Sequence, residues 1–179
     1  MKFLSFASRS FALICNENKN NTNNDLIVVI NFTYNLHKLS YYNIAMSSSK
    51  INFNKPPKFL SILGSQGIEF NKKNNSAVMK FIINENLTHS NGKIVQGGFI
   101  TAMLDTSMAH LLIFTNSGEI NPLTLNVSVT FLASGSPGEF VASSKIEKQG
   151  KSIAFTSAAL HQNNVLIATA SSTNKLIHL

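Results

Sequence analysis

The sequence predicts an α+β domain in which an antiparallel sheet of about five to six strands wraps one long central helix. Residues 96–114, QGGFITAMLDTSMAHLLIF, are apolar over most of their length, as expected of a buried helix. Residues 123–131 alternate apolar and polar side chains with the period that strands show. Two turn signals, Gln149-Gly150 and Asn163-Asn164, divide the remaining sequence into further strands.

Shorter elements precede the long helix. Pro56-Pro57 opens the segment KFLSIL and Gly64 follows it, which predicts a short helix because proline suits the first helical turn and glycine the position after the last. Strands are predicted for residues 66–72 and 76–84. A polar loop, NENLTHSNGK, leads from the second strand to the long helix.

Four strands are predicted after the helix. The first ends at SGSPGE, a segment rich in turn residues. The others cover residues 139–148, 151–161 and 165–176, and the two turn signals separate them. The apolar residues that alternate in the first of these strands are Leu123, Leu125, Val127, Val129 and Phe131. Strands joined by such short turns pair antiparallel and form a meander.

Residues 1–49 differ from the rest, and we expect them to be an extension to a domain that spans residues 50–179. Residues 1–14 contain basic, Ser and Phe residues but no acidic residue, which loosely resembles a targeting segment. An Asn-rich tract of low complexity follows. Two interpretations stay open. Either the protein starts at Met46 and is cytoplasmic, with a spurious or disordered upstream segment, or residues 1–45 direct it to the mitochondrion.

Composition narrows the class of protein. The chain has 179 residues, of which 44% are hydrophobic and 13% charged, so it has the length of one domain and enough apolar residues for a core. The net charge is +7, but 14 of the 15 basic residues are lysines, and they are scattered. Base recognition favours arginine, so we expect no nucleic-acid partner. Mild attraction for anionic small molecules is the alternative.

Metal and membrane functions are also disfavoured. The single cysteine, Cys15, permits no intramolecular disulfide and no cysteine-cage metal site. His89, His110 and His161 lack the spacing of metal ligands, so we expect no metal site. No run of about 18 consecutive apolar residues occurs, so we expect no membrane-spanning helix.

The long helix carries an isolated acid. Asp105 is the only Asp, Glu, Lys or Arg between residues 94 and 118. A carboxylate on an apolar helix is costly unless it is paired, hydrogen-bonded or solvated in a cleft. Two interpretations stay open on this evidence: a structural Asp105 bonded to a hydroxyl such as that of Thr101, four residues earlier, or a functional carboxylate.

A glycine pair stands at the start of the same helix. Gln96-Gly97-Gly98 lets a ligand approach the backbone closely, because glycine has no side chain. The first N–H groups of a helix are unpaired, and the helix dipole favours negative charge there. This turn therefore suits a carbonyl oxygen that becomes an oxyanion, or else it is only a tight connection.

These segments resemble a known family. QGGFITAMLDTSMAHLL, the strand with Thr124 and Asn126, and SPGEFVASSKIEKQGKSIAFTSAAL are similar to the hotdog-fold thioesterase superfamily. Within it the chain is most similar to phenylacetyl-CoA thioesterases (PaaI) and acyl-CoA thioesterase 13-like proteins. The resemblance covers residues 56–176 and leaves residues 1–45 without a counterpart. It implies a hotdog fold and dimers or tetramers with the site between subunits. It also implies hydrolysis of acyl-CoA with no metal and no other cofactor, since CoA is part of the substrate.

The resemblance also assigns roles. It implies that Asp105 acts as general base or orients water, that the Gly97 N–H polarises the thioester carbonyl, and that Thr124 holds the water. Gln96 stands where the family often has His, and it can donate a hydrogen bond but cannot shuttle protons. The family often has an Asn where this chain has Ser90, so Asn91, one residue later, is its candidate counterpart.

The resemblance further implies where CoA binds. It places CoA along the strand after the helix and at the later hairpin, with Lys148, Lys151 and Lys175 as candidates for its phosphates. The implied lining residues are Asn126, Phe131, Leu132, Ala133, Ser134, Gly135, Ser136, Lys148, Gln149, Gly150, Lys151, Ser152, Ile153 and Lys175.

Three functions compete at this point. The leading one is an acyl-CoA thioesterase acting on an aryl- or fatty acyl-CoA. The second is a non-hydrolytic acyl-CoA binding or sensing module on the same fold, which Gln96 and the shifted Asn91 favour. The third is a hotdog dehydratase, but such enzymes pair a His with the acid, and no His lies near the glycine pair in the sequence.

Overall fold

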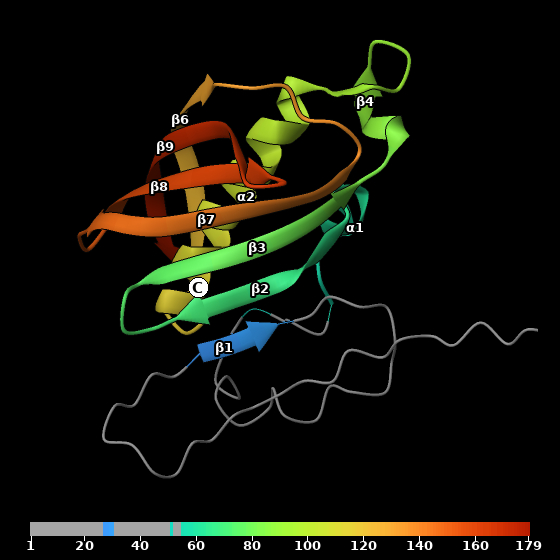
Figure 1. Cartoon of the computed structure of the whole chain (residues 1–179). Coiled ribbons are helices and arrows are strands. Elements are labelled where there is room, and N and C mark those ends of the chain that lie inside the picture. Colours follow the sequence, from blue (N-terminus) through green and yellow to red (C-terminus); the bar gives the residue numbers. More distant parts are fainter. Residues whose placement is uncertain (1–26, 31–50, 52–54) are drawn as a thin grey trace, which may run out of the picture.

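One curved antiparallel sheet wraps the long helix α2 (Gly97–Thr115), as Figure 1 shows. This computed structural model of the protein describes residues 27–30, 51 and 55–179, and for residues 27–30 only the backbone. The sheet order is β1-β2-β3-β7-β8-β9-β6. The strands are β1 (Ile27–Ile30), β2 (Ser65–Asn71), β3 (Ser76–Ile83), β6 (Ile120–Phe131), β7 (Gly138–Gln149), β8 (Ile153–Gln162) and β9 (Val165–His178). The predicted hotdog fold is confirmed, and residues 50–179 supply six strands of the main sheet.

The core lies between the concave face of the sheet and α2. Apolar residues surround most of this helix, and the curved sheet removes many of them from water. The fully buried residues of α2 include Met103, Leu104, Met108 and Leu111. They form one cluster with alternate residues of the sheet, among them Met79, Phe81, Phe140 and Leu160.

The short helix α1 (Lys58–Ile62) starts after Pro57 and ends before Gly64, as predicted. Gly64 has a φ of +64°, and a Cβ there would lie 1.9 Å from the carbonyl oxygen of Ile82. Its own carbonyl accepts a hydrogen bond from the Ile82 N–H at 2.8 Å. This close approach, together with the positive φ, requires glycine.

The polar loop predicted at residues 84–93 contains structure. A 3-10 turn η1 (Glu85–Leu87) follows Asn84, whose side chain accepts a hydrogen bond from the Asn86 N–H. β4 (Thr88–His89) then pairs with β5 (Ile94–Val95) in a small separate sheet. These pieces are too short for a periodic signal in the sequence.

Strand β6 departs from strict alternation. Its register with β9 shifts between Thr124 and Asn126, which is a β-bulge at Leu125. Leu123 and Leu125 are therefore exposed, whereas Val127 and Val129 pack against the core. The predicted strand is present, but its apolar residues do not share one face, because the bulge inserts one extra residue and reverses the alternation.

The predicted extension, residues 1–49, contributes one described element. β1 pairs with the outer edge of β2, with Ile27 opposite Asn71 and Ile30 opposite Ile68. The predicted targeting segment, the Asn-rich tract, Cys15 and Met46 lie outside the described residues.

We expect a chain that begins at Met46 to keep the melting temperature of the full chain. It loses β1, but the cluster around α2 is built from residues after position 50. Thermal melting of both chains tests this. A fall of more than about 5 °C, roughly 1 kcal/mol for a domain of this size, would show that the extension is part of the fold.

Candidate functional site

Asp105 and Thr124 form a hydrogen-bonded pair between α2 and β6. The Thr124 Oγ1 lies 2.9 Å from the Asp105 Oδ1. Both residues are half-buried, so the carboxylate is accessible from one side. A structural role for Asp105 would have Thr101 as its partner. The Thr101 hydroxyl instead donates to the carbonyl of Gly97 at 3.0 Å. The bulge at Leu125 makes the pair possible, since it puts Thr124 on the inner face together with Val127.

A buried polar cluster stands behind Thr124. The Asn174 Oδ1 lies 3.1 Å from the Thr124 Oγ1, and Asn174 is fully buried. The Asn174 Nδ2 lies 2.7 Å from the Ser172 Oγ, which lies 2.7 Å from the Thr156 Oγ1. The Thr124 hydroxyl has a single proton, so it donates either to Asp105 or to Asn174 at one time. Asn174 thus competes with Asp105 for this proton.

Sequence reasoning missed Asn174. Ser172 and Asn174 occupy alternate inward positions of β9, in line with Leu176. Polar residues at successive inward positions of a core strand are a readable signal, because burial without partners is costly.

The start of α2 is capped by Gln96. Its Oε1 accepts a hydrogen bond from the Gly98 N–H at 2.6 Å, and a Cβ on Gly98 would lie 2.7 Å from that oxygen. With Oε1 occupied, the Gln96 amide retains its NH₂ group as a donor. Within the described residues, the Gly97 N–H has no hydrogen-bond partner. The helix start therefore offers donors to a ligand oxygen.

Phe131 lies against this helix start. A Cβ on Gly97 would lie 3.3 Å from the Phe131 Cζ, and the Phe131 ring is half-exposed. The segment that follows is tied to its neighbours by backbone hydrogen bonds from Leu132 and Ala133 to the carbonyl of Ile167. The Gly135 carbonyl accepts from the Val95 N–H at 2.9 Å. The structure thus brings the predicted segment 131–136 to the N-terminal end of α2.

The other predicted CoA segment lies at the opposite end of α2. The Gln149 Nε2 donates to the side chain of Asn116, the residue that follows α2, at 2.8 Å. Lys175 pairs with Ile153 across β8 and β9 and is exposed, as are Lys148 and Lys151. Within one chain, residues 148–153 are therefore separated from residues 131–136 by the length of the helix.

Two predicted site residues stand apart from the rest. Asn91 and Ser90 both have positive φ and are exposed in the turn between β4 and β5. In the part of the chain that the structure describes, no hydrogen bond joins either one to Gln96 or Gly97. Asn126 is exposed beside the bulge and faces away from the Asp105–Thr124 pair.

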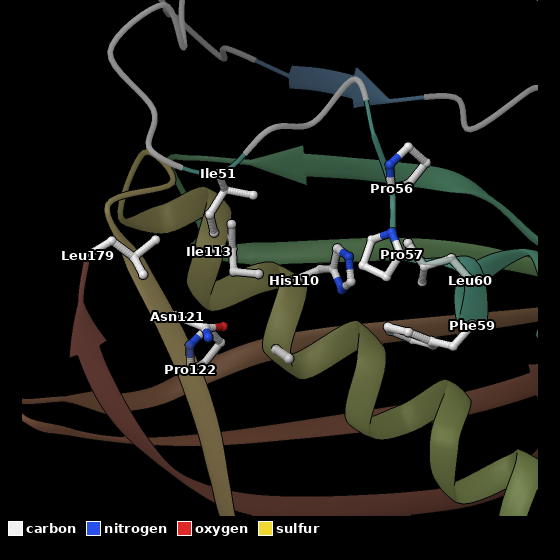
Figure 2. Close-up of a pocket in the computed structure, with 11 residues that line it drawn as sticks. Ile51, Pro56, Pro57, Phe59, Leu60, His110, Ile113, Asn121, Pro122 and Leu179 are labelled. Carbon is white, nitrogen blue, oxygen red and sulfur yellow. The ribbon is translucent and has the colours of Figure 1, made fainter.

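A cavity of about 440 Å³ lies between α1, the C-terminal half of α2 and the start of β6, as Figure 2 shows. Its lining residues are Ile51, Pro56, Pro57, Phe59, Leu60, Ala109, His110, Ile113, Asn121, Pro122 and Leu179. The His110 Nδ1 lies 2.9 Å from the carbonyl oxygen of Thr106, so this nitrogen carries the proton. Burial lowers the pKa of His110 below its ordinary value of 6.5, and the hydrogen bond to Thr106 opposes this in part.

Acid is expected to destabilise the protein through His110. The unfolded chain binds the His110 proton more readily than the folded chain does, because the folded pKa is lowered. This contribution to stability is therefore complete above the unfolded pKa, near pH 6.5, and is lost as the pH falls through the lower folded pKa. The melting temperature of the wild type should fall more steeply than that of His110→Gln below about pH 6.5. Parallel melting curves for the two proteins would contradict this.

Two general features complete the description. Among the described helices, α2 is long and apolar enough to cross a membrane by length and composition, but half of it is buried inside the molecule, as expected of a core helix. The described residues contain no group of His, Cys, Asp or Glu that could hold a metal ion.

Comparison with known proteins agrees with this architecture. The family model of the thioesterase superfamily matches residues 92–168. A phenylacetic acid degradation-related protein of Ralstonia eutropha JMP134 is similar at 26% identity, with a TM-score of 0.64 over 68% of this chain and 91% of that one. PaaI of Escherichia coli, from the phenylacetic acid degradation operon, gives 18% identity and a TM-score of 0.58 over 68% and 85%.

A Streptococcus mutans protein whose structure holds acetyl CoA gives 16% identity and a TM-score of 0.52 over 58% of this chain and 82% of that one. A search among curated proteins finds no match. The predicted resemblance is confirmed: residues 92–168 match the thioesterase superfamily within a hotdog fold, and the chain is similar to PaaI.

Proposed function

We propose that the protein is an acyl-CoA thioesterase that hydrolyses the thioester of an aryl- or fatty acyl-CoA to the free acid and CoA. The observation that carries this proposal is the Asp105–Thr124 pair between α2 and β6, on a helix whose Gly97 N–H has no partner among the described residues. The reaction needs no metal or covalent cofactor, because water is the nucleophile and the helix start supplies the electrophilic groups.

The chemistry follows from these groups. Thr124 and the Asp105 carboxylate hold a water, and Asp105 takes its proton as the water oxygen attacks the thioester carbon. The carbonyl oxygen becomes an oxyanion, which the Gly97 N–H and the Gln96 amide stabilise. The C–S bond then breaks, the acid is released, and the CoA thiolate takes up the proton that Asp105 received.

A single chain does not provide both halves of this site. Gly97 and Asp105 are eight residues apart on one helix, which separates them by about 12 Å along its axis. An attacking water and the carbonyl it attacks lie about 3 Å apart, so one thioester does not span that gap. We therefore place the site between two copies, with Asp105 and Thr124 from one and Gly97 and Gln96 from the other, in a homodimer or homotetramer.

The free edge of β6 supports this assembly. In the described sheet β6 pairs only with β9, and Leu123 and Leu125 are exposed on it. An open strand edge with apolar residues is a ready surface for a second copy. Two copies related by a two-fold axis would also bring residues 131–136 of one toward residues 148–153 of the other, so both predicted CoA segments would reach one ligand.

Mixing two inactive variants is expected to restore activity. Asp105→Asn removes the base, and Gly97→Pro removes the N–H at the helix start. In a mixed dimer one of the two sites receives intact residues from both copies. The purified mixed dimer should therefore have about half the wild-type activity, and an unfractionated random mixture about a quarter. Co-expression with two different affinity tags and assay of the doubly tagged fraction measures this. An active monomer by light scattering, or a mixed dimer as inactive as its parents, would contradict a shared site.

A non-hydrolytic acyl-CoA binding module is the second candidate function. Gln96 favours it, because its oxygen is committed to the helix cap and an amide does not exchange protons near neutral pH. The test is a panel of acyl-CoA esters of different chain length and ring content, with detection of free thiol, run on the full chain and on the chain from Met46. Binding without thiol release identifies the module.

We propose a cytoplasmic location, and a mitochondrial one if residues 1–45 are a presequence.

A further inference from the structure

The cavity lined by His110 contains none of the residues to which the proposed function gives a role. Its volume of about 440 Å³ lies within the range of about 300–1,000 Å³ that is usual for small-molecule pockets. Its lining is apolar apart from His110 and Asn121, and no charged side chain contributes to it. Such a lining suits an uncharged apolar group.

The cavity lies in line with Asp105 on α2. The sheet leaves one stripe of this helix partly uncovered, and Thr101, Asp105, Ala109 and Ile113 follow one another along it at intervals of four residues. Residues four apart lie on the same face of a helix. Ala109 and Ile113 line the cavity, so its near end is one turn, about 6 Å, beyond Asp105.

Strand β6 repeats this alignment. Pro122 lines the cavity and is two residues before Thr124, so the two side chains point to the same face of the strand. The cavity is therefore next to the Asp105–Thr124 pair on both elements. In Figure 2 the side chains of α1, α2 and β6 converge on one space.

We propose that this cavity holds the acyl tail of the thioester, with Ala109 at its entrance. The inference rests on the proposed function and extends it to a substrate class: acyl groups with an apolar tail, aliphatic or aryl, and without a terminal charge. A thioester carbonyl beside Asp105 would direct its tail along the uncovered stripe, past Ala109, toward Ile113.

His110 fits the same substrate class. Its Nδ1 proton is used by the Thr106 carbonyl, and burial favours the neutral ring near pH 7. A neutral imidazole gives no ion pair to an acid-terminated tail, and burying an unpaired carboxylate is costly. Dicarboxylic acyl-CoA esters are therefore excluded by the lining.

Calorimetric binding to the full-length Asp105→Asn protein tests the proposal without turnover. Affinity should rise from acetyl-CoA to decanoyl-CoA by up to about fourfold for each methylene that the cavity buries. Adding Ala109→Leu should reduce the affinity for decanoyl-CoA at least tenfold and leave that for acetyl-CoA unchanged. The matched control is Ala159→Leu, the same change on the outer face of β8, which should alter neither affinity.

A second variant covers the case in which Ala109→Leu does not fold. Ile113→Ala enlarges the cavity and should shift the preferred chain length upward. Equal losses of affinity for acetyl-CoA and decanoyl-CoA, or no effect of chain length on affinity in either variant, would overturn the assignment of the cavity to the acyl tail. Failure of the proposed function has a different signature: chain-length-dependent binding persists, but the wild type releases no thiol from any ester.

Discussion

Asp105→Asn is expected to lower turnover by about 10²–10⁴-fold, the usual contribution of a positioned acid or base. The amide keeps the shape of the carboxylate and can still accept a hydrogen bond from Thr124, but it cannot take a proton from water. Affinity for CoA esters should change little, because the predicted CoA-binding segments lie away from Asp105. Steady-state kinetics on an ester that the wild type cleaves measures the loss.

The opposite pattern would indicate a structural Asp105. In that case the substitution changes the melting temperature, and the protein that remains folded turns over at a near-normal rate. Melting and kinetics are therefore measured on the same sample. Near-normal turnover of a folded Asp105→Asn protein would remove this residue from the mechanism and favour the binding module.

Gly97→Pro is expected to lower turnover by about 10²–10³-fold, the usual effect of losing one oxyanion donor. Proline has no N–H, yet it suits the first helical position, so α2 should keep its start. The residue before it also fits, since Gln96 has an extended backbone with φ of −68° and ψ of 135°, as residues before proline do.

The matched control is Gly97→Ala, which retains the N–H and adds only a Cβ near Phe131. It should therefore retain far more activity than Gly97→Pro, because the Phe131 ring is half-exposed and can shift. If alanine and proline reduce turnover equally while both proteins stay folded, the space over Gly97 matters and its N–H does not.

The fold could be predicted because its signals are local. α2 is a long and mostly apolar stretch, and the turns at Gln149-Gly150 and Asn163-Asn164 mark the hairpins, so the main elements are visible in short windows. Asp105 also stood out, as the one acid in an apolar helix. Thr124 was singled out only through the family resemblance, as the residue that holds the water, and its 2.9 Å contact with Asp105 becomes visible only in the folded chain.

What the sequence did not show depends on distant segments. The bulge at Leu125 appears only when β6 is set against β9, because its residues taken alone alternate regularly. Asn174 is fifty positions from Thr124, and no short window contains both. The cavity draws on α1, α2 and β6, three elements that meet only in the folded chain.

The extra residue in β6 makes the contact between Thr124 and Asp105 depend on how many residues the strand contains as well as on which they are. A deletion of Leu125 would leave the side chains of both flanking stretches intact but turn Thr124 to the outer face. Loss of this single codon would thus break the contact between Thr124 and Asp105 while every other side chain of the strand is kept. Conversely, a hotdog domain without such a bulge could have nearly the same composition and still lack a hydroxyl beside the acid of its long helix.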